Sequence, residues 1–339
     1  MEVIRGWTHT AFPIEDDSRI GEARRFAARA VESWQWNADD AGRLALVITE
    51  LGTNLLRHAV QGRLLIAARA DVAEVEILSI DEGPGMDDLS TCMQDGHSSG
   101  STAGIGMGAV KRLANEFDIH TAVPAGTVSV ARVRAGRETG SAAPPAVMRL
   151  GAVCLPAPGE IECGDAWAAG WDDARIALTI VDGLGHGPEA AKASSAAVDI
   201  FTAAPGAGIQ DIVQRTHVGL QATRGAALCV ATVDIATRKL SYVGAGNIVG
   251  RIVSGVFDKS LVTQHGTAGA QIRKPEGAEA DIPEHALVIF HSDGLAARWK
   301  PETIQPLLRR DPAIIAAVLL RDHSRLRDDA TVVVLRLNA

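Results

Sequence analysis

The chain has 339 residues, a length typical of two domains, and its apolar content of 47% is normal for packed globular domains. The net charge of −8 comes without a basic stripe, which argues against nucleic-acid binding, and no apolar run is long enough to span a bilayer. The first residues do not form a signal peptide and the four cysteines lack metal-ligand spacing, so we expect a cytoplasmic protein with reduced thiols and no membrane partner.

Helical and strand patterns alternate in the first part of the chain. Asp16, Asp17 and Ser18 are typical of a helix start, so a first helix is expected from there to about Trp34. The segment 136–146 has no periodicity and is rich in Gly, Ser, Ala and Pro, which indicates a linker between domains 1–135 and 147–339. The other N-terminal helices are expected over about 39–59 and 106–117, and the strands over 63–68, 72–80 and 127–134.

After the linker, the pattern is rich in strands. Two helices, over about 188–202 and 209–223, follow the run Asp182-Gly-Leu-Gly-His-Gly187. Long hairpins with paired helices predict a β-sandwich covered by helices, so the chain is placed in the α+β class with two domains. The expected strands are 148–155, 164–171, 175–181, 226–234, 239–245 and 287–292.

Three polar residues share one face of the second expected helix. Glu50, Asn54 and His58 are spaced four apart, beside an apolar stripe that includes Leu51 and Leu55. A polar stripe of this kind is usually only a solvated surface. In a nucleotide site, however, Glu50 could take a proton from an attacking hydroxyl or water, and Asn54 could supply a neutral oxygen ligand to Mg²⁺.

Two glycine motifs favour the nucleotide interpretation. Asp81-Glu-Gly83-Pro-Gly85 follows an expected strand, and Gly104-Ile-Gly106-Met-Gly108 opens an expected helix. Glycines let the backbone approach a ligand and present N–H groups to phosphate, and a carboxylate at Asp81 could accept the exocyclic amine of adenine. Either motif alone is typical of a tight turn, and the second lacks the context of a Rossmann fingerprint.

The three motifs in this order resemble the GHKL ATPases, which have a Bergerat α/β sandwich. The stretch Asp95-Gly-His-Ser-Ser99, followed by 104–117, is similar to the RsbT-type switch kinases, relatives of the RsbW and SpoIIAB anti-sigma kinases. The resemblance covers most of residues 1–135. It implies that ATP and Mg²⁺ bind here, with Glu50 as the catalytic base, Asn54 as the Mg²⁺ ligand and Asp81 as the adenine contact. It also implies that the ATP pocket and its lid are shaped by Gly83, Gly85, Gly104, Gly106 and Gly108.

Carboxylates also adjoin several apolar stretches of the C-terminal half. Asp182 follows 177–181, Asp293 follows 287–290, and Asp328 and Asp329 precede 331–335. Carboxylates at the ends of buried strands can converge on one point, and hard oxygen ligands suit Mg²⁺ or Mn²⁺. An isolated Asp-Gly pair is nearly always a turn, but turns alone do not explain this order of motifs.

This pattern resembles the metal-dependent protein phosphatases of the 2C class, in particular the SpoIIE/RsbX branch, over residues 147–339. The resemblance implies an α-β-β-α sandwich with two Mn²⁺ or Mg²⁺ ions, which lower the pKa of a bridging water and clamp the phosphoryl oxygens. Asp182 would bridge the ions, and Cys163 stands where many relatives have glycine. The implied metal ligands are Asp165, Asp182, the carbonyl of Gly183, Asp293 and Asp328.

Neighbouring polar residues receive supporting or structural roles. Asp329 would point away from Asp328 on an extended strand, so we expect it to support the site without binding metal. His186 could be a general acid, but such a histidine more often satisfies loop backbone groups. Asn247 is expected to be a turn residue.

The leading functional hypothesis is therefore a bifunctional partner-switching regulator. The N-terminal half would phosphorylate Ser or Thr on a STAS-domain partner, and the C-terminal half would remove phosphate from such a partner. In the alternative, only the phosphatase is catalytic, and the N-terminal half senses ATP or a partner and regulates it. An anti-sigma factor fits the RsbT-like sequence less well, and a homodimer is left open.

Overall fold

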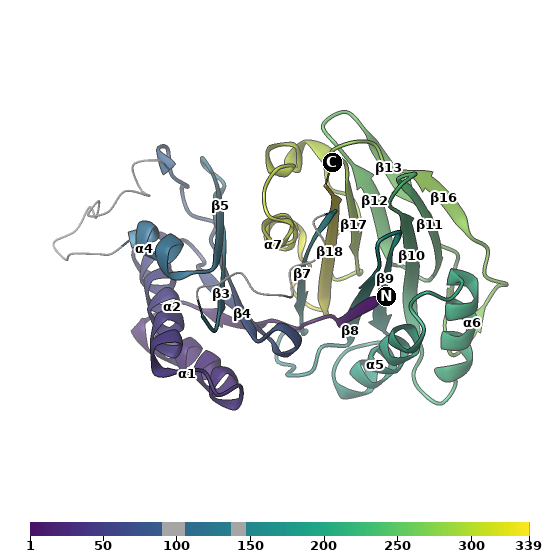
Figure 1. The fold of residues 1–339 in the computed structure, drawn as a ribbon, viewed down its shortest axis with the longest axis horizontal. Helices are drawn as coiled ribbons and strands as arrows, with labels where there is room; N and C mark the ends of the chain where they lie inside the picture. Colours follow the sequence, from purple (N-terminus) through teal and green to yellow (C-terminus); the bar gives the residue numbers. More distant parts are fainter. Residues whose placement is uncertain (90–105, 137–146, 339) are drawn as a thin grey trace. The chain divides into compact units, whose positions relative to one another are not determined.

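The computed structural model describes residues 1–89, 106–136 and 147–338, which form parts of two compact units (Figure 1). One unit is His9–Ala143, and the other joins Met1–Thr8 to Pro144–Ala339. The first eight residues were expected in the N-terminal domain. Instead, β1 (Glu2–Arg5) pairs antiparallel with β8 (Asp165–Trp171), so it extends the sheet of the second unit. The sequence could not reveal this because pairing at a sheet edge depends on main-chain groups rather than on side-chain type.

The His9–Ala143 unit is an antiparallel sheet with helices on one face. Its strand order is β2-β3-β4-β6-β5. Apolar side chains of the helices and of alternate sheet positions form one core, to which Ile48, Leu51 and Ile77 belong. The elements are β2 (Thr10–Pro13), α1 (Asp17–Ser33), α2 (Ala38–His58), β3 (Arg63–Arg69), β4 (Glu74–Ile80), α4 (Gly106–Leu113), β5 (Glu116–Ala122) and β6 (Gly126–Arg134).

Side chains cap the start of both long helices of this unit: Asp16 lies in the expected capping run, whereas the cap at Asn37 was not predicted. The Asp16 carboxylate accepts hydrogen bonds from the backbone N–H groups of Ser18 and Arg19, at 2.7 and 3.3 Å. The side chain of Asn37 accepts one from the N–H of Asp40 at 2.8 Å. These bonds satisfy helix N–H groups that have no partner within the helix, which explains why the helices begin there.

The third helix is shorter than its apolar pattern predicts. α4 ends at Leu113, and the next residues leave the helix to form β5, which pairs with β6. Two contacts stop the helix: Arg43 donates to the carbonyl of Leu113 at 3.1 Å, and the N–H of Asn115 donates to the carbonyl of Arg132 at 2.8 Å. The expected helix to 117 was wrong because a helical period cannot reveal these tertiary hydrogen bonds.

The sheet face opposite the helices carries a buried network of charged side chains. Glu74 and Glu76 are both fully buried. Arg132 donates to Glu76 at 2.7 Å and to Glu116 at 2.9 Å, and Arg134 donates to Glu116 at 2.6 Å. Despite the cost of burial, Arg132 and the hydrogen bond with His9 keep the pKa of Glu76 below its ordinary range. The carboxylate therefore stays ionised inside the sheet.

The second unit is an α-β-β-α sandwich, as expected. One sheet has the order β1-β8-β9-β10-β11-β16 and is covered by α5 and α6, whose apolar residues share a core with it (Figure 1). The other sheet has the order β13-β12-β17-β18-β7, and α7 packs against β7 and β18. The strands, besides β1 and β8, are β7 (Met148–Leu155), β9 (Arg175–Gly183), β10 (Ala226–Asp234), β11 (Lys239–Ala245), β12 (Val249–Val253), β13 (Asp258–Leu261), β14 (Gly266–Thr267), β15 (Gln271–Ile272), β16 (Ala278–Asp281), β17 (Leu287–His291) and β18 (Ala330–Leu337).

The helices of this unit are α5 (Pro188–Ala203), α6 (Ile209–Gly219) and α7 (Pro312–His323). The first two match their expected positions, although α6 ends four residues early. α7 was not expected because residues 312–320 are all buried, so its sequence has no apolar stripe of helical period. In the described part of the chain, no helix is long and apolar enough to cross a membrane.

Candidate functional site

The predicted nucleotide residues of the His9–Ala143 unit lie around the C-terminal half of α2. Asn54 projects from α2 toward the first turn of α4, where its amide lies 3.2 Å from the sulfur of Met107. Glu50 stands one helical turn before Asn54 and, like it, is half-buried. Asn54 therefore lies beside the start of α4, where Gly106 and Gly108 of the second motif lie.

The first glycine motif forms a tight loop after β4. The Asp81 carboxylate accepts from the N–H of Gly83 at 2.7 Å, which closes the turn. A Cβ at Gly83 would lie 3.2 Å from the carbonyl oxygen of His58, at the end of α2. Gly85 has φ +76°, and a Cβ there would lie 2.5 Å from the carbonyl of Ala122, so only glycine fits.

The second glycine motif is described only in part. Gly104 and the stretch 95–99 lie outside the described residues. Gly106 begins α4 with φ +59°, and Gly108 is buried against the core. The structure therefore brings Asn54 beside α4 and Gly83 beside the end of α2, while the ligand contacts of Glu50 and Asp81 stay predictions.

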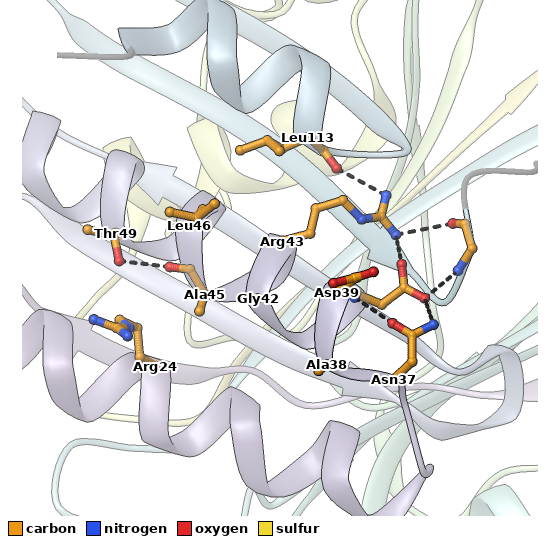
Figure 2. Close-up of a pocket in the computed structure, with 12 residues that line it drawn as sticks. Arg24, Asn37, Ala38, Asp39, Gly42, Arg43, Ala45, Leu46, Thr49 and Leu113 are labelled. Carbon is orange, nitrogen blue, oxygen red and sulfur yellow. Dashed lines mark hydrogen bonds and ion pairs between the residues drawn. The ribbon is translucent and has the colours of Figure 1, made fainter. Parts of the chain in front are cut away.

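A cavity of about 920 Å³ opens at the other end of α2, next to Leu46 and Thr49 (Figure 2). None of the predicted nucleotide residues lines it. Its wall carries Arg43, which donates to Asp40 at 2.9 Å and to the carbonyl of Leu113 at 3.1 Å. Because this guanidinium is already paired with structural acceptors, we interpret the cavity as a consequence of how α2 holds α4.

The predicted phosphatase residues gather where the two sheets of the second unit meet. Asp165 and Asp182 are directly paired on β8 and β9, so their side chains point to the same side. The hydroxyl of Ser292, which follows β17 in the other sheet, donates to Asp165 at 2.6 Å. The same hydroxyl accepts from the N–H of Thr331 at 3.0 Å. Ser292 therefore joins the two sheets at the site and orients Asp165.

The carboxylates are close enough to perturb one another. Burial, and then Asp293, Asp328 and Asp329, raise the pKa of Asp182 to about 7. Burial, and then Asp182, raise the pKa of Asp165 well above its ordinary value. Burial, and then Asp328, also raise the pKa of Asp293. The site therefore concentrates negative charge, which in a low dielectric favours protonation or a bound cation.

Close backbone packing fixes the loops that carry these ligands. A Cβ at Gly183 would lie 2.3 Å from the carbonyl of Ala190, and its N–H donates to Gly164 at 3.0 Å. A Cβ at Gly294 would lie 1.9 Å from the carbonyl of Asp329. Glycines beside the carboxylates thus permit an approach of strands that no side chain would allow.

Comparisons with known proteins match each half of the chain to a separate family model. Residues 12–132 match the family model of the histidine kinase-like ATPase domain, and residues 172–338 match that of stage II sporulation protein E. The serine/threonine-protein kinase RsbT of Bacillus subtilis (strain 168) is 31% identical over 110 residues, which cover 32% of this chain and 83% of RsbT. The chain belongs to the RsbT-like kinase family, fused to a SpoIIE-type phosphatase domain.

The phosphatase half has relatives of its own. The phosphoserine phosphatase RsbX of the same organism is 27% identical over 90 residues, or 26% of this chain, and the match spans only 45% of RsbX. A solved chain from the bacterial stressosome, a modular system adapted to control secondary messenger signalling, has a TM-score of 0.53 and 28% identity; the match covers 56% of this chain and 99% of that one. RsbX in complex with magnesium has a TM-score of 0.52 and 20% identity, over 58% of this chain and 98% of that one, and so shows the same fold.

The donor set of the RsbT–SpoIIE fusion suits divalent metal. Four carboxylates and the carbonyl of Gly183 are hard oxygen donors, and the raised pKa of Asp182 shows that a cation there would offset charge repulsion. Within the described ranges, no three His, Cys, Asp or Glu side chains are gathered closely enough to hold an ion. Binding of an ion would therefore need these carboxylates to lie closer together than they do in this structure.

Three residues of the site differ from their predicted roles or were not predicted. Asn247 does lie in a turn, but its amide also donates to Asp293 at 2.6 Å. His186 does not bind loop backbone groups; its Nδ1 lies 2.8 Å from the carboxylate of Glu160. Ser292 was not predicted, although its position just before Asp293 was a usable signal. Asp329 accepts from the N–H of Ala157 at 2.8 Å, which fits a supporting role.

Proposed function

We propose that the chain is a bifunctional partner-switching regulator, a protein kinase in its N-terminal unit and a metal-dependent protein phosphatase in its C-terminal unit. The observation that supports this most is that the described residues of each unit place expected polar groups near one another. Glu50 and Asn54 lie on one face of α2, and the acidic residues gather around Asp182 in the other unit.

In the kinase unit, Mg·ATP supplies the phosphoryl group when bound. The amide oxygen of Asn54 would bind Mg²⁺, and the carboxylate of Asp81 would accept the amine of adenine. Glu50, one turn from Asn54, would accept the proton of the partner's Ser or Thr hydroxyl. Gly106 and Gly108 would present backbone N–H groups of α4 to phosphate oxygens.

In the phosphatase unit, two Mg²⁺ or Mn²⁺ ions supply an activated water and neutralise phosphoryl charge when bound. Asp182 would hold both ions, and the carbonyl of Gly183 would complete one coordination shell. Ser292 and Asn247 would fix the side chains of their ligand partners, Asp165 and Asp293, through the hydrogen bonds of 2.6 Å. The remaining ligand of this set would be Asp328.

The proposed substrates are STAS-domain antagonist or scaffold proteins, in phosphorylated and unphosphorylated forms. This rests on the likeness to RsbT, RsbX and a stressosome chain. A kinase and a phosphatase acting on one phosphosite would form a futile cycle. We therefore expect either different phosphosites or a ligand that selects between the two activities.

The test uses full-length protein with the substitution Asp182→Asn, so that dephosphorylation cannot hide the product. This protein is mixed with candidate STAS-domain proteins and γ-labelled ATP, and label transfer is measured. The double variant Asp182→Asn/Glu50→Gln should bind ATP normally but transfer label about 10²–10⁴-fold more slowly. The exposed Glu15→Gln, outside both glycine motifs, is the matched control and should leave transfer unchanged.

A second candidate is a phosphatase regulated by a non-catalytic nucleotide sensor. It is favoured by chain connectivity, because the ATPase unit is inserted between β1 and the rest of the phosphatase unit. If the N-terminal unit is only a sensor, no candidate partner is labelled in the assay with γ-labelled ATP, although ATP still binds. ATP should then change the phosphatase rate of the wild-type protein. That result would exclude the kinase activity.

A further inference from the structure

Two cysteines of the phosphatase unit lie side by side next to its acidic site. Cys154 is near the end of β7, and Cys163 lies in the loop just before β8. Their sulfur atoms are 3.5 Å apart, although nine residues separate them in sequence. The exposed fractions are 1% for Cys154 and 9% for Cys163. Two thiols in contact are unusual in a core, where each would normally pack against apolar groups.

The thiols are held in place by contacts from three segments of the chain. The hydroxyl of Thr8, beyond β1, lies 3.9 Å from the sulfur of Cys154. The thiol of Cys154 donates to the carbonyl of Asp165 at 3.8 Å. The pair is therefore fixed between β7, the segment after β1 and the first residue of β8.

Small molecules can reach this pair through an adjoining cavity. The cavity has a volume of about 530 Å³, and Thr8, Cys163 and Asp165 are among the residues that line it. Cys163 is thus the accessible member of the pair, and Cys154 lies behind it.

We propose that Cys154 and Cys163 form a reversible thiol-oxidation site, which a hydroperoxide converts into a disulfide. The sulfur of Cys163 attacks the O–O bond of hydrogen peroxide, so one oxygen is transferred to sulfur as a sulfenic acid and the other leaves as water. The sulfur of Cys154 then displaces the sulfenic oxygen as a second water, and the S–S bond forms. In total, two thiols lose two hydrogen atoms, and one peroxide is reduced to two waters.

The disulfide would act on the metal ligands, and this part rests on the proposed phosphatase function. The sulfur atoms must move from 3.5 Å to about 2.0 Å apart. Gly164 separates Cys163 from Asp165 and is closely packed, because a Cβ there would lie 2.5 Å from Asp329 and 2.8 Å from Ala190. We expect the displacement to reach Asp165 and its bond with Ser292, so the oxidised protein should need more Mn²⁺ for activity.

The test begins with chemistry that does not depend on phosphatase activity. Full-length reduced protein is treated with hydrogen peroxide, free thiols are alkylated, and cross-linked peptides are identified by mass spectrometry. We expect one peptide pair, joined at Cys154 and Cys163, that is two hydrogens lighter and is restored by dithiothreitol. Cys154→Ser and Cys163→Ala should each abolish it, whereas the buried Cys229→Ala is the control and should retain it.

Unfolding temperatures of the reduced variants show whether each has folded. The proposal is overturned if both thiols can still be alkylated when the protein is unfolded after peroxide treatment. It is also overturned if Cys163 is oxidised only to sulfinic acid. The phosphatase rate is then measured against Mn²⁺ concentration for reduced and cross-linked wild-type protein. A cross-link with unchanged Mn²⁺ dependence would keep the oxidation site but refute its action on the metal ligands. An inactive reduced protein that still forms the cross-link would count against the phosphatase function alone.

Discussion

Replacing Asp182 by Asn should stabilise the metal-free phosphatase unit while removing its stabilisation by Mn²⁺. Asp182 is largely buried among Asp293, Asp328 and Asp329, and its pKa is raised from 3.8 to about 7. An acid with a raised pKa in the folded state destabilises that state wherever the unfolded chain would be ionised. Asparagine keeps the shape of the side chain and removes the charge, so the penalty disappears.

The raised pKa of Asp182 sets the size and the pH dependence of this stability difference. The difference between 3.8 and about 7 corresponds to about 4 kcal/mol once the folded carboxyl is ionised. The penalty is absent below pH 3.8, grows as the pH rises toward 7, and is complete above 7. At pH 8 the variant should therefore unfold about 8–16 °C higher than wild type, taking 2–4 °C per kcal/mol for a unit of this size. At pH 5 the difference should be much smaller.

The assay is differential scanning calorimetry of both proteins in EDTA at pH 5 and pH 8, following the transition of the phosphatase unit. Addition of Mn²⁺ should then raise the unfolding temperature of wild type but not that of the variant, since binding to the folded state alone stabilises it. The exposed Asp173→Asn serves as the matched control and should change neither value. A variant that is less stable than wild type at pH 8 in EDTA, or that keeps the full response to Mn²⁺, would refute the reasoning.

Two further predictions concern the ATPase unit. Asp81→Asn should weaken ATP binding, because an acceptor for the adenine amine is lost. Asn54→Ala should weaken binding of Mg·ATP more than binding of metal-free ATP, because an oxygen ligand for Mg²⁺ is lost. Equal ATP affinities of wild type and both variants in calorimetric titration would contradict this pocket. Arg132→Met should lower the free energy of unfolding of the unit by about 3–5 kcal/mol, because it leaves Glu76 buried without its 2.7 Å partner. The double variant Arg132→Met/Glu76→Gln should recover part of that loss, and the exposed Arg29→Met should be neutral, as measured by urea unfolding. Because the pKa of Glu76 is lowered in the folded state, wild type should lose this stabilisation as the pH falls below about 4.

The sequence determined the local elements whose signals are short-range. The cap at Asp16 placed the start of α1, and the apolar stripe through Ile48 and Leu51 placed α2. The expected strands over 148–155, 226–234 and 239–245 match β7, β10 and β11, each of which contains a run of four buried residues. The order of the glycine and aspartate motifs likewise sufficed to predict the family of each half.

Only the tertiary structure decided which distant groups meet. α7 has no apolar stripe because it is buried on all sides. β1 pairs with β8 of the second unit through main-chain groups, although the residues that follow it in sequence belong to the other unit. The bonds from Ser292 to Asp165 and from Asn247 to Asp293 join the two sheets or adjoining turns. Such contacts depend on strand order and register, which arise from packing the whole core, so no local pattern of residue types could specify them.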